Sequence, residues 1–277
     1  MLKKLFEYEW KDSWKIVGGM NLAVLLLSVL SRLFYRESFL DIIDNNEYMM
    51  IVFVLYNILY FAVIIALALI TQYYFYYRFY KNLYTDEGYL MHTLPVTAHE
   101  LIWAKTFTAI LWQIIGGVVL MLSFGNFVDI MMRMDGSNIW VLLRQMNSSL
   151  WEALASLEAT APIICIAILF VLLIIVAPFF RLYFGYLAIS LGQLTKKHKL
   201  LAAVGIFFGL SYGLQLVFSL FTVPIARFAE RLDELSVNAG LWAVALMVAV
   251  LVLVFAALSV GCYYLTHFVM TKKLNLE

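Results

Sequence analysis

Charged residues are scarce in this chain of 277 residues. Asp, Glu, Lys and Arg together make up 13% of it, whereas hydrophobic residues make up 64% and the mean hydropathy is +0.90. A soluble domain has about 25% charged residues. The shortage of charge therefore excludes a soluble fold and indicates an integral membrane protein. The net charge of +1 gives no reason to expect a nucleic-acid partner.

Two motifs of nucleotide binding and metal catalysis are also missing. No GxxxxGK[ST] pattern is present, so the chain cannot hold a nucleotide in a P-loop of its own. His99-Glu100 begins like the zinc-peptidase motif HExxH, but the fifth residue is Trp103, so the second zinc ligand is absent. We therefore expect a non-catalytic chain without a metal site and without a bound cofactor.

Six apolar runs are long enough to cross a bilayer, which takes about 20 residues in a helix. They cover Ile16–Phe34, Met49–Tyr77, Lys105–Gly125, Pro162–Leu182, Leu201–Pro224 and Leu241–Phe268. No soluble domain fits between them, so we predict an all-α polytopic membrane protein with residues 1–277 in a single transmembrane domain. Charged residues precede the first run, which has span length, so we expect it to remain in the mature chain.

The distribution of Lys and Arg predicts the orientation in the membrane. If the chain alternates through six spans, twelve of these residues fall on one side. They are Lys3, Lys4, Lys11, Lys15, Arg78, Lys81, Lys105, Lys196, Lys197, Lys199, Lys272 and Lys273. We therefore expect both termini in the cytoplasm. Cys165 and Cys262 then lie near opposite membrane faces, too far apart for a disulfide, and we interpret both as packing residues.

The segments outside the spans have distinct patterns. Residues 1–15 place Leu2, Phe6, Trp10 and Trp14 on one helical stripe, which predicts an interfacial helix that leads like an elbow into the first span. The expected extracellular loop, residues 126–161, contains an amphipathic stretch, Trp140–Leu157. This stretch either lies on the outer surface or caps an exit path.

The expected cytoplasmic loop at residues 78–104 is a polar island between two spans. Thr97 and Glu100 have the spacing of a capping box, in which each side chain satisfies a backbone N–H at a helix start. Asp86 and Glu87 fit the start of a second short helix, which Pro95 would end. The loop is predicted to be a helix, a kink and a helix.

A few polar residues and glycines interrupt the spans. Asn57, Gln113 and Gln215 either bond to a neighbouring helix or line a substrate path. No Asp or Glu lies deep in a span as delimited above, which argues against a proton-driven carrier. The fifth span contains a doubled GxxxG pattern, which predicts close helix packing within the subunit or at a dimer interface. Its glycines are Gly205, Gly209 and Gly213.

Two stretches carry a resemblance to a known family. DEGYLMHTLPVTAHELIWAK, Asp86–Lys105, and AISLGQLTKKHKLL, Ala188–Leu201, resemble segments of ABC type-2 permease subunits, in particular the six-span exporters of Gram-positive bacteria. The resemblance implies a plasma-membrane permease that works with two separate ATPase subunits, which bind ATP and Mg, and with a second permease copy or a paralogue. Membrane lipid is its remaining partner.

In that family the first cytoplasmic loop holds a coupling helix that sits in a cleft of the ATPase, and the second loop, residues 192–200 here, makes a smaller contact. The resemblance therefore implies a set of ATPase-contacting residues. They are Asp86, Glu87, Tyr89, Leu90, His92, Leu94, Pro95, Thr97, Glu100, Gln193, Lys196, Lys197 and His198.

The expected function is export of a peptide, a lipid-like molecule or a drug-like molecule, with energy from the partner ATPase. A second hypothesis keeps the complex but makes it a sensing or resistance system for antimicrobial peptides with little bulk transport. A third is an unrelated six-span carrier or membrane enzyme.

Overall fold

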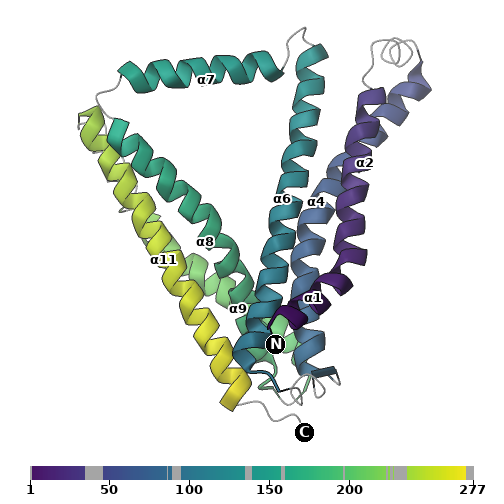
Figure 1. Ribbon diagram of the computed structural model, residues 1–277, viewed down its shortest axis with the longest axis vertical. Coiled ribbons are helices and arrows are strands. Elements are labelled where there is room, and N and C mark those ends of the chain that lie inside the picture. Colours follow the sequence, from purple (N-terminus) through teal and green to yellow (C-terminus); the bar gives the residue numbers. More distant parts are fainter. Residues whose placement is uncertain are drawn as a thin grey trace. The chain divides into compact units, whose positions relative to one another are not determined.

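The computed structural model describes residues 2–34, 46–85, 87–88, 95–134, 139–156, 160–195, 197–222, 224, 227 and 236–272. All regular elements in these ranges are helices (Figure 1). They are α1 (Leu2–Ser13), the π-helix η1 (Trp14–Gly18), α2 (Gly19–Phe34), α4 (Glu47–Tyr84), α6 (Ala98–Met134), α7 (Ile139–Ser156), α8 (Thr160–Gly192), α9 (Lys199–Leu220) and α11 (Val237–Lys272).

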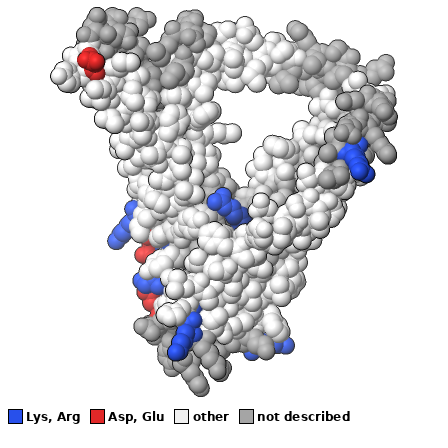
Figure 2. Space-filling model, turned by 180° about the vertical axis from the view of Figure 1, so that it is seen from behind, with Lys and Arg blue, Asp and Glu red and all other residues white. Residues whose placement is uncertain are grey.

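Six helical stretches are long and apolar enough to cross a membrane, and each contains most of one predicted span. They are Leu2–Arg32, Glu47–Tyr84, Ala98–Ile130, Ala161–Gly192, Lys199–Leu220 and Val237–Lys272. The prediction of an all-α, multi-pass membrane protein is confirmed by helix length and hydropathy. On the face drawn in Figure 2, charged side chains are few among the described residues, as a surface in contact with lipid requires.

The chain divides into two compact units. Unit 1 comprises Met1–Phe75 and Phe107–Ser149, and unit 2 comprises Tyr76–Thr106 and Leu150–Glu277. The boundary falls within α4 and α6, so each of these helices contributes one part to each unit.

Unit 1 is built on a seam between α2 and α6 in which buried residues recur every three or four positions. This spacing is typical of helices that pack at a shallow crossing angle. On η1 and α2 they are Val17, Asn21, Val24, Ser28 and Ser31, and on α6 they are Trp112, Gly116, Val119 and Ser123. α4 joins the pair through Leu67, which packs with Val24 and Val119. In lipid, the hydrophobic effect does not drive helices together, so hydrogen bonds between the polar residues of this seam contribute to helix association.

The predicted elbow at residues 1–15 is a change of helix type. α1 continues through the π-helical turn η1 into α2, and Figure 1 shows the direction of the chain changing there. Trp112 of α6 fills the bend: its ring stacks on Trp10 at 4.7 Å and its Nε1 donates to Ser13 Oγ at 2.9 Å. A Cβ on Gly18 would lie 3.3 Å from the same ring. α1 is therefore tied directly to α6.

Unit 2 centres on the last turns of α8. Every residue from Leu182 to Ser190 is buried, on all sides of the helix. α9 and α11 pack against α8, and the last turns of α4 and the first turns of α6 complete its cover. A helix that is buried all round is fixed by its neighbours, so this part of α8 is the core of unit 2.

Candidate functional site

The ends of α4 and α8 lie side by side in unit 2, and each leads into one of the two polar loops. Residue numbers increase in the same direction along both helices at successive contacts. Tyr76 Oη donates to the Arg181 carbonyl at 2.6 Å, and the Phe79 and Tyr186 rings stack at 3.8 Å. At the helix ends, the hydroxyls of Tyr84 and Ser190 are 2.6 Å apart. The two helices are therefore parallel here, and both loops begin at the same level.

The direction of the last hydrogen bond follows from the bonding of Ser190. Its hydroxyl donates to the Tyr186 carbonyl at 2.8 Å, and a hydroxyl has only one proton. Tyr84 must therefore donate to Ser190 Oγ. Both residues are buried, so this chain of hydrogen bonds is protected from competing water.

The capping box predicted at the end of the first loop is confirmed. Glu100 Oε2 accepts from the backbone N–H of Thr97 at 3.0 Å and from its hydroxyl at 3.2 Å, and the Glu100 backbone N–H lies 3.3 Å from Thr97 Oγ1. α6 begins at Ala98, directly after the cap. The loop thus enters a long helix without a flexible connection.

The first turns of α6 also contact α11. His99 Nδ1 is hydrogen-bonded to Tyr263 Oη, and the rings of Trp103 and Tyr263 are 6.1 Å apart. Tyr263 in turn meets Tyr183 of α8 edge to face at 5.3 Å. One aromatic side chain therefore connects the capped start of α6 with α8 and α11.

The second loop is a tight connection between α8 and α9. Gly192 ends α8 so close to α9 that a Cβ there would lie 2.6 Å from Ala203 Cα. Thr195 closes the turn by donating its hydroxyl to the Gly192 carbonyl at 2.8 Å. His198 precedes α9 in the left-handed conformation, with φ 53° and ψ 46°, which a residue other than glycine adopts at a cost.

The residues expected to contact an ATPase fall into two groups. Asp86, Tyr89, Leu90, His92, Leu94 and Lys196 lie outside the described residues. Of the others, Pro95, Thr97, Lys197 and His198 are exposed, whereas Glu100 and Gln193 are half-buried. Glu87 is exposed and forms an ion pair with Lys81 at 2.8 Å. The described members thus offer accessible polar groups at the loop ends.

The three residues considered for a substrate path have different surroundings. Gln113 donates to Gln72 Oε1 of α4 at 3.0 Å, so it bonds to a neighbouring helix. Asn57 donates to the Phe53 carbonyl of its own helix at 2.8 Å. Gln215 is exposed and belongs to unit 2, whereas the other two belong to unit 1. Neither unit by itself contains a path lined by all three.

The glycines of α9 have no close neighbour. A Cβ added to Gly205, Gly209 or Gly213 would meet nothing within 4 Å among the described residues. Packing of this stripe within the chain is therefore not observed in the part of the chain that the structure describes. A contact with a second subunit stays a prediction.

Residues Gly209 to Gly213 also match GxSxG, a sequence pattern of hydrolases. That pattern carries a nucleophile only on a sharp turn between a strand and a helix. Here it lies inside α9, and the Ser211 hydroxyl donates to the Phe207 carbonyl at 2.7 Å. The arrangement does not fit a nucleophile elbow. Among the described residues, no group of His, Cys, Asp and Glu could hold a metal ion.

A charged cluster in unit 1 was missed in the sequence. Arg32 Nε donates to Asn126 Oδ1 at 2.5 Å, and the Arg32 guanidinium lies 3.5 Å from Asp129 Oδ2. Asn126 Nδ2 donates to the Ser28 carbonyl at 2.7 Å. The third apolar run of the sequence ends at Gly125, but α6 continues to Met134, so a buried carboxylate lies at the end of a span. The polar positions 126 and 129, one turn apart, were the available signal.

No protein-family model, curated protein or solved structure matches the chain. The fold and the site together define a class, which is a multi-pass all-α membrane protein whose two polar loops start from paired helix ends.

Proposed function

We propose that this chain is the permease subunit of an ATP-driven ABC exporter, which moves a peptide, lipid-like or drug-like substrate out of the cell. The observation that carries the proposal is the pairing of Tyr84 with Ser190, because it starts both polar loops from one level, where a single partner can contact both. The resemblance of Asp86–Lys105 and Ala188–Leu201 to exporter permeases supplies the class of partner.

In this proposal the energy comes from two ATPase subunits, which bind ATP and Mg, and the complete transporter includes a second permease copy or a paralogue. The chain itself is not an enzyme and lies in the bacterial plasma membrane with both termini in the cytoplasm. A push on the first loop reaches α6 directly, because Thr97 and Glu100 cap its first turn. It reaches α11 through the bond between His99 and Tyr263. The contacts of unit 2 thus support mechanical coupling.

The test is co-purification with a partner. The chain is expressed with a tag together with its neighbouring genes and isolated in detergent, and the co-purified proteins are searched for a P-loop ATPase. We expect the chain and the ATPase to be recovered together. Leu90→Asp, in the stretch that resembles the coupling helix, should abolish recovery, whereas Leu265→Asn on α11, 53% exposed, should not. Absence of association in the wild type would contradict the proposal.

The exposed helix α7 favours one alternative within the same complex. Every side chain described from Trp140 to Ser149 is exposed, and so is Trp151. An amphipathic helix with exposed tryptophans suits contact with an amphipathic peptide or with the lipid surface. In this second candidate function the complex senses or sequesters an antimicrobial peptide. Deletion of Trp140–Leu157 that abolishes resistance but preserves dye efflux would support it.

A further inference from the structure

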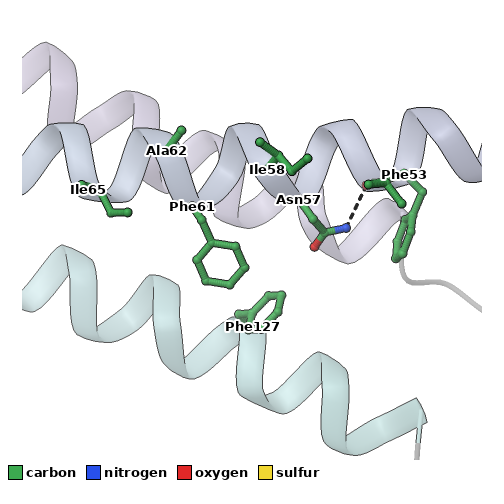
Figure 3. Close-up of a pocket in the computed structure, with 8 residues that line it drawn as sticks. Phe53, Asn57, Ile58, Phe61, Ala62, Ile65 and Phe127 are labelled. Carbon is green, nitrogen blue, oxygen red and sulfur yellow. Dashed lines mark hydrogen bonds between the residues drawn. The ribbon is translucent and has the colours of Figure 1, made fainter.

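A groove with a volume of about 680 Å³ lies between α4 and α6 in unit 1. Seven residues between Phe53 and Ile65 of α4 form one side, and Phe127 of α6 forms the other (Figure 3). The volume lies within the range of about 300–1,000 Å³ that is usual for small-molecule sites. The groove is therefore large enough to hold part of a ligand.

The residues that line the groove favour an apolar ligand group. The lining side chains are aliphatic or aromatic with the exception of Asn57, and no charged residue is among them. The Asn57 amide is directed along its own helix, where it donates to the Phe53 carbonyl at 2.8 Å (Figure 3). A polar or charged ligand group placed here would lose its hydration without gaining an ionic partner. The part of a ligand that enters must be apolar.

The aromatic wall is fixed in place. Phe61 and Phe127 meet edge to face with centroids 5.0 Å apart and an interplanar angle of 76°. Tyr60 stacks on Phe127 at 6.1 Å, and its hydroxyl donates to the Ser123 carbonyl at 2.7 Å. A wall that is already ordered reduces the entropy cost of binding.

The length of the groove is close to the thickness of one leaflet. Twelve helical steps separate Phe53 from Ile65, which is about 18 Å at 1.5 Å per residue. Half of a hydrocarbon core of about 30 Å is about 15 Å. Asn126, next to Phe127, accepts from Arg32, whose side chain is 61% exposed and lies at a span end. Because such a cation reaches the interface, Arg32 places the groove in the leaflet on its own side. Phe127 itself lies opposite Phe61, within the groove and not at its end (Figure 3).

We propose that this groove binds one acyl chain of a membrane phospholipid, taken from the leaflet on the side of Arg32. A lining that is apolar except for Asn57, a fixed aromatic wall and a length of about one leaflet together specify such a chain. The site goes beyond the proposed transport function and does not depend on it.

The experiment uses the full chain in liposomes of phosphatidylcholine with a photoactivatable diazirine in the acyl chain. Labelled peptides are quantified by mass spectrometry after illumination. We expect several-fold more label between Phe53 and Ile65 than between Ile164 and Ile175 of α8. Both ends of that control stretch are more than half exposed, and it lines no described groove. Equal labelling of the two stretches would overturn the proposal, because ordinary lipid contact would then explain it.

Two variants distinguish lipid binding in the groove from lipid contact with the rest of the α4 surface. Ala62→Trp fills the groove and should remove the excess label. Leu59→Trp changes an exposed residue of the same helix that does not line the groove, and it should keep the label. Size-exclusion profiles verify that both fold, and the milder Ala62→Leu replaces Ala62→Trp if that variant does not. Label retained in the filled groove contradicts the proposal, and so does cross-linking of this stretch to a second copy of the chain.

Discussion

Tyr84 Oη and Ser190 Oγ lie 2.6 Å apart, buried between the last turns of α4 and α8. The two residues are 106 positions apart in the sequence, yet each is the last or nearly the last residue before a polar loop. This bond fixes the two loop starts to each other, so a partner that binds one loop also finds the other within unit 2.

Removing the phenol hydroxyl tests how firmly the loop starts are joined. Tyr84→Phe should lower the free energy of unfolding by about 0.6 kcal/mol, the average for hydrogen bonds between helices in membranes, and by no more than about 1.7 kcal/mol. Thermal unfolding in detergent measures it. Ser190→Ala should cost a similar amount, and the double variant should cost less than the sum. Ser211→Ala serves as the control, because that hydroxyl donates to the Phe207 carbonyl of its own helix. Additive effects at Tyr84 and Ser190 would contradict the bond.

Valine substitutions of two glycines should differ sharply. At Gly192 the new side chain would overlap the backbone of Ala203, so Gly192→Val should destabilise by about 1–3 kcal/mol, as overpacking does. At Gly209 a Cβ meets nothing among the described residues, so Gly209→Val should leave stability almost unchanged or raise it slightly. Thermal shift of the two purified variants compares them directly. A large loss at Gly209 would instead indicate that a second subunit packs on the glycine stripe.

Loss of the capping box should loosen the start of α6. Thr97→Ala removes the hydroxyl that faces the Glu100 N–H and should cost about 0.5–2 kcal/mol. Hydrogen exchange at the first amides of α6 should become faster, while exchange near Trp112 should not change. Thr271→Ala, at an exposed threonine that bonds within α11, is the matched control. If exchange at the start of α6 stays the same, the cap does not hold that turn.

The elbow should depend on Trp112. Trp112→Phe keeps a ring against Trp10 but removes the donor to Ser13, so we expect a loss of about 0.5–1.5 kcal/mol. Trp112→Ala should cost about 3–5 kcal/mol, because it also empties a fully buried site. Chemical denaturation in mild detergent separates the two. Equal losses would show that the hydrogen bond, and not the packed ring, fixes α1.

Substitutions of Arg32 and Asp129 in the charged cluster of unit 1 should lower stability by different amounts. The Asp129 side chain is 5% exposed, whereas that of Arg32 is 61% exposed. Arg32→Ala leaves a buried carboxylate without this cation and should cost about 1–2 kcal/mol, below the roughly 3–5 kcal/mol known for fully buried pairs. Asp129→Asn should cost less, and the double variant should recover part of the loss at Arg32. Equal costs for the two single variants, measured by thermal unfolding, would contradict this order.

Local features of the candidate site were predictable, but its assembly was not. Thr97 and Glu100 lie three residues apart, so their capping box depends on one helical turn and could be predicted from the sequence. Asp129 ends a hydropathy window because it is charged, yet it is buried next to Arg32, 97 residues away. Only packing of α2 against α6 makes that position suitable for a carboxylate. Likewise, a GxxxG pattern predicts a close approach but not which helix makes it.

The sequence by itself determined that this is a membrane protein of six long apolar helices, because the length of each run and the scarcity of charge depend only on residue type. It also determined where α6 begins, since a helix cap is a local interaction. The tertiary structure decided that α4 and α8 end side by side at Tyr84 and Ser190, and that Trp112 ties α1 to α6. Those contacts join residues about 100 positions apart, and no local preference specifies which helix faces lie together until the whole unit has packed.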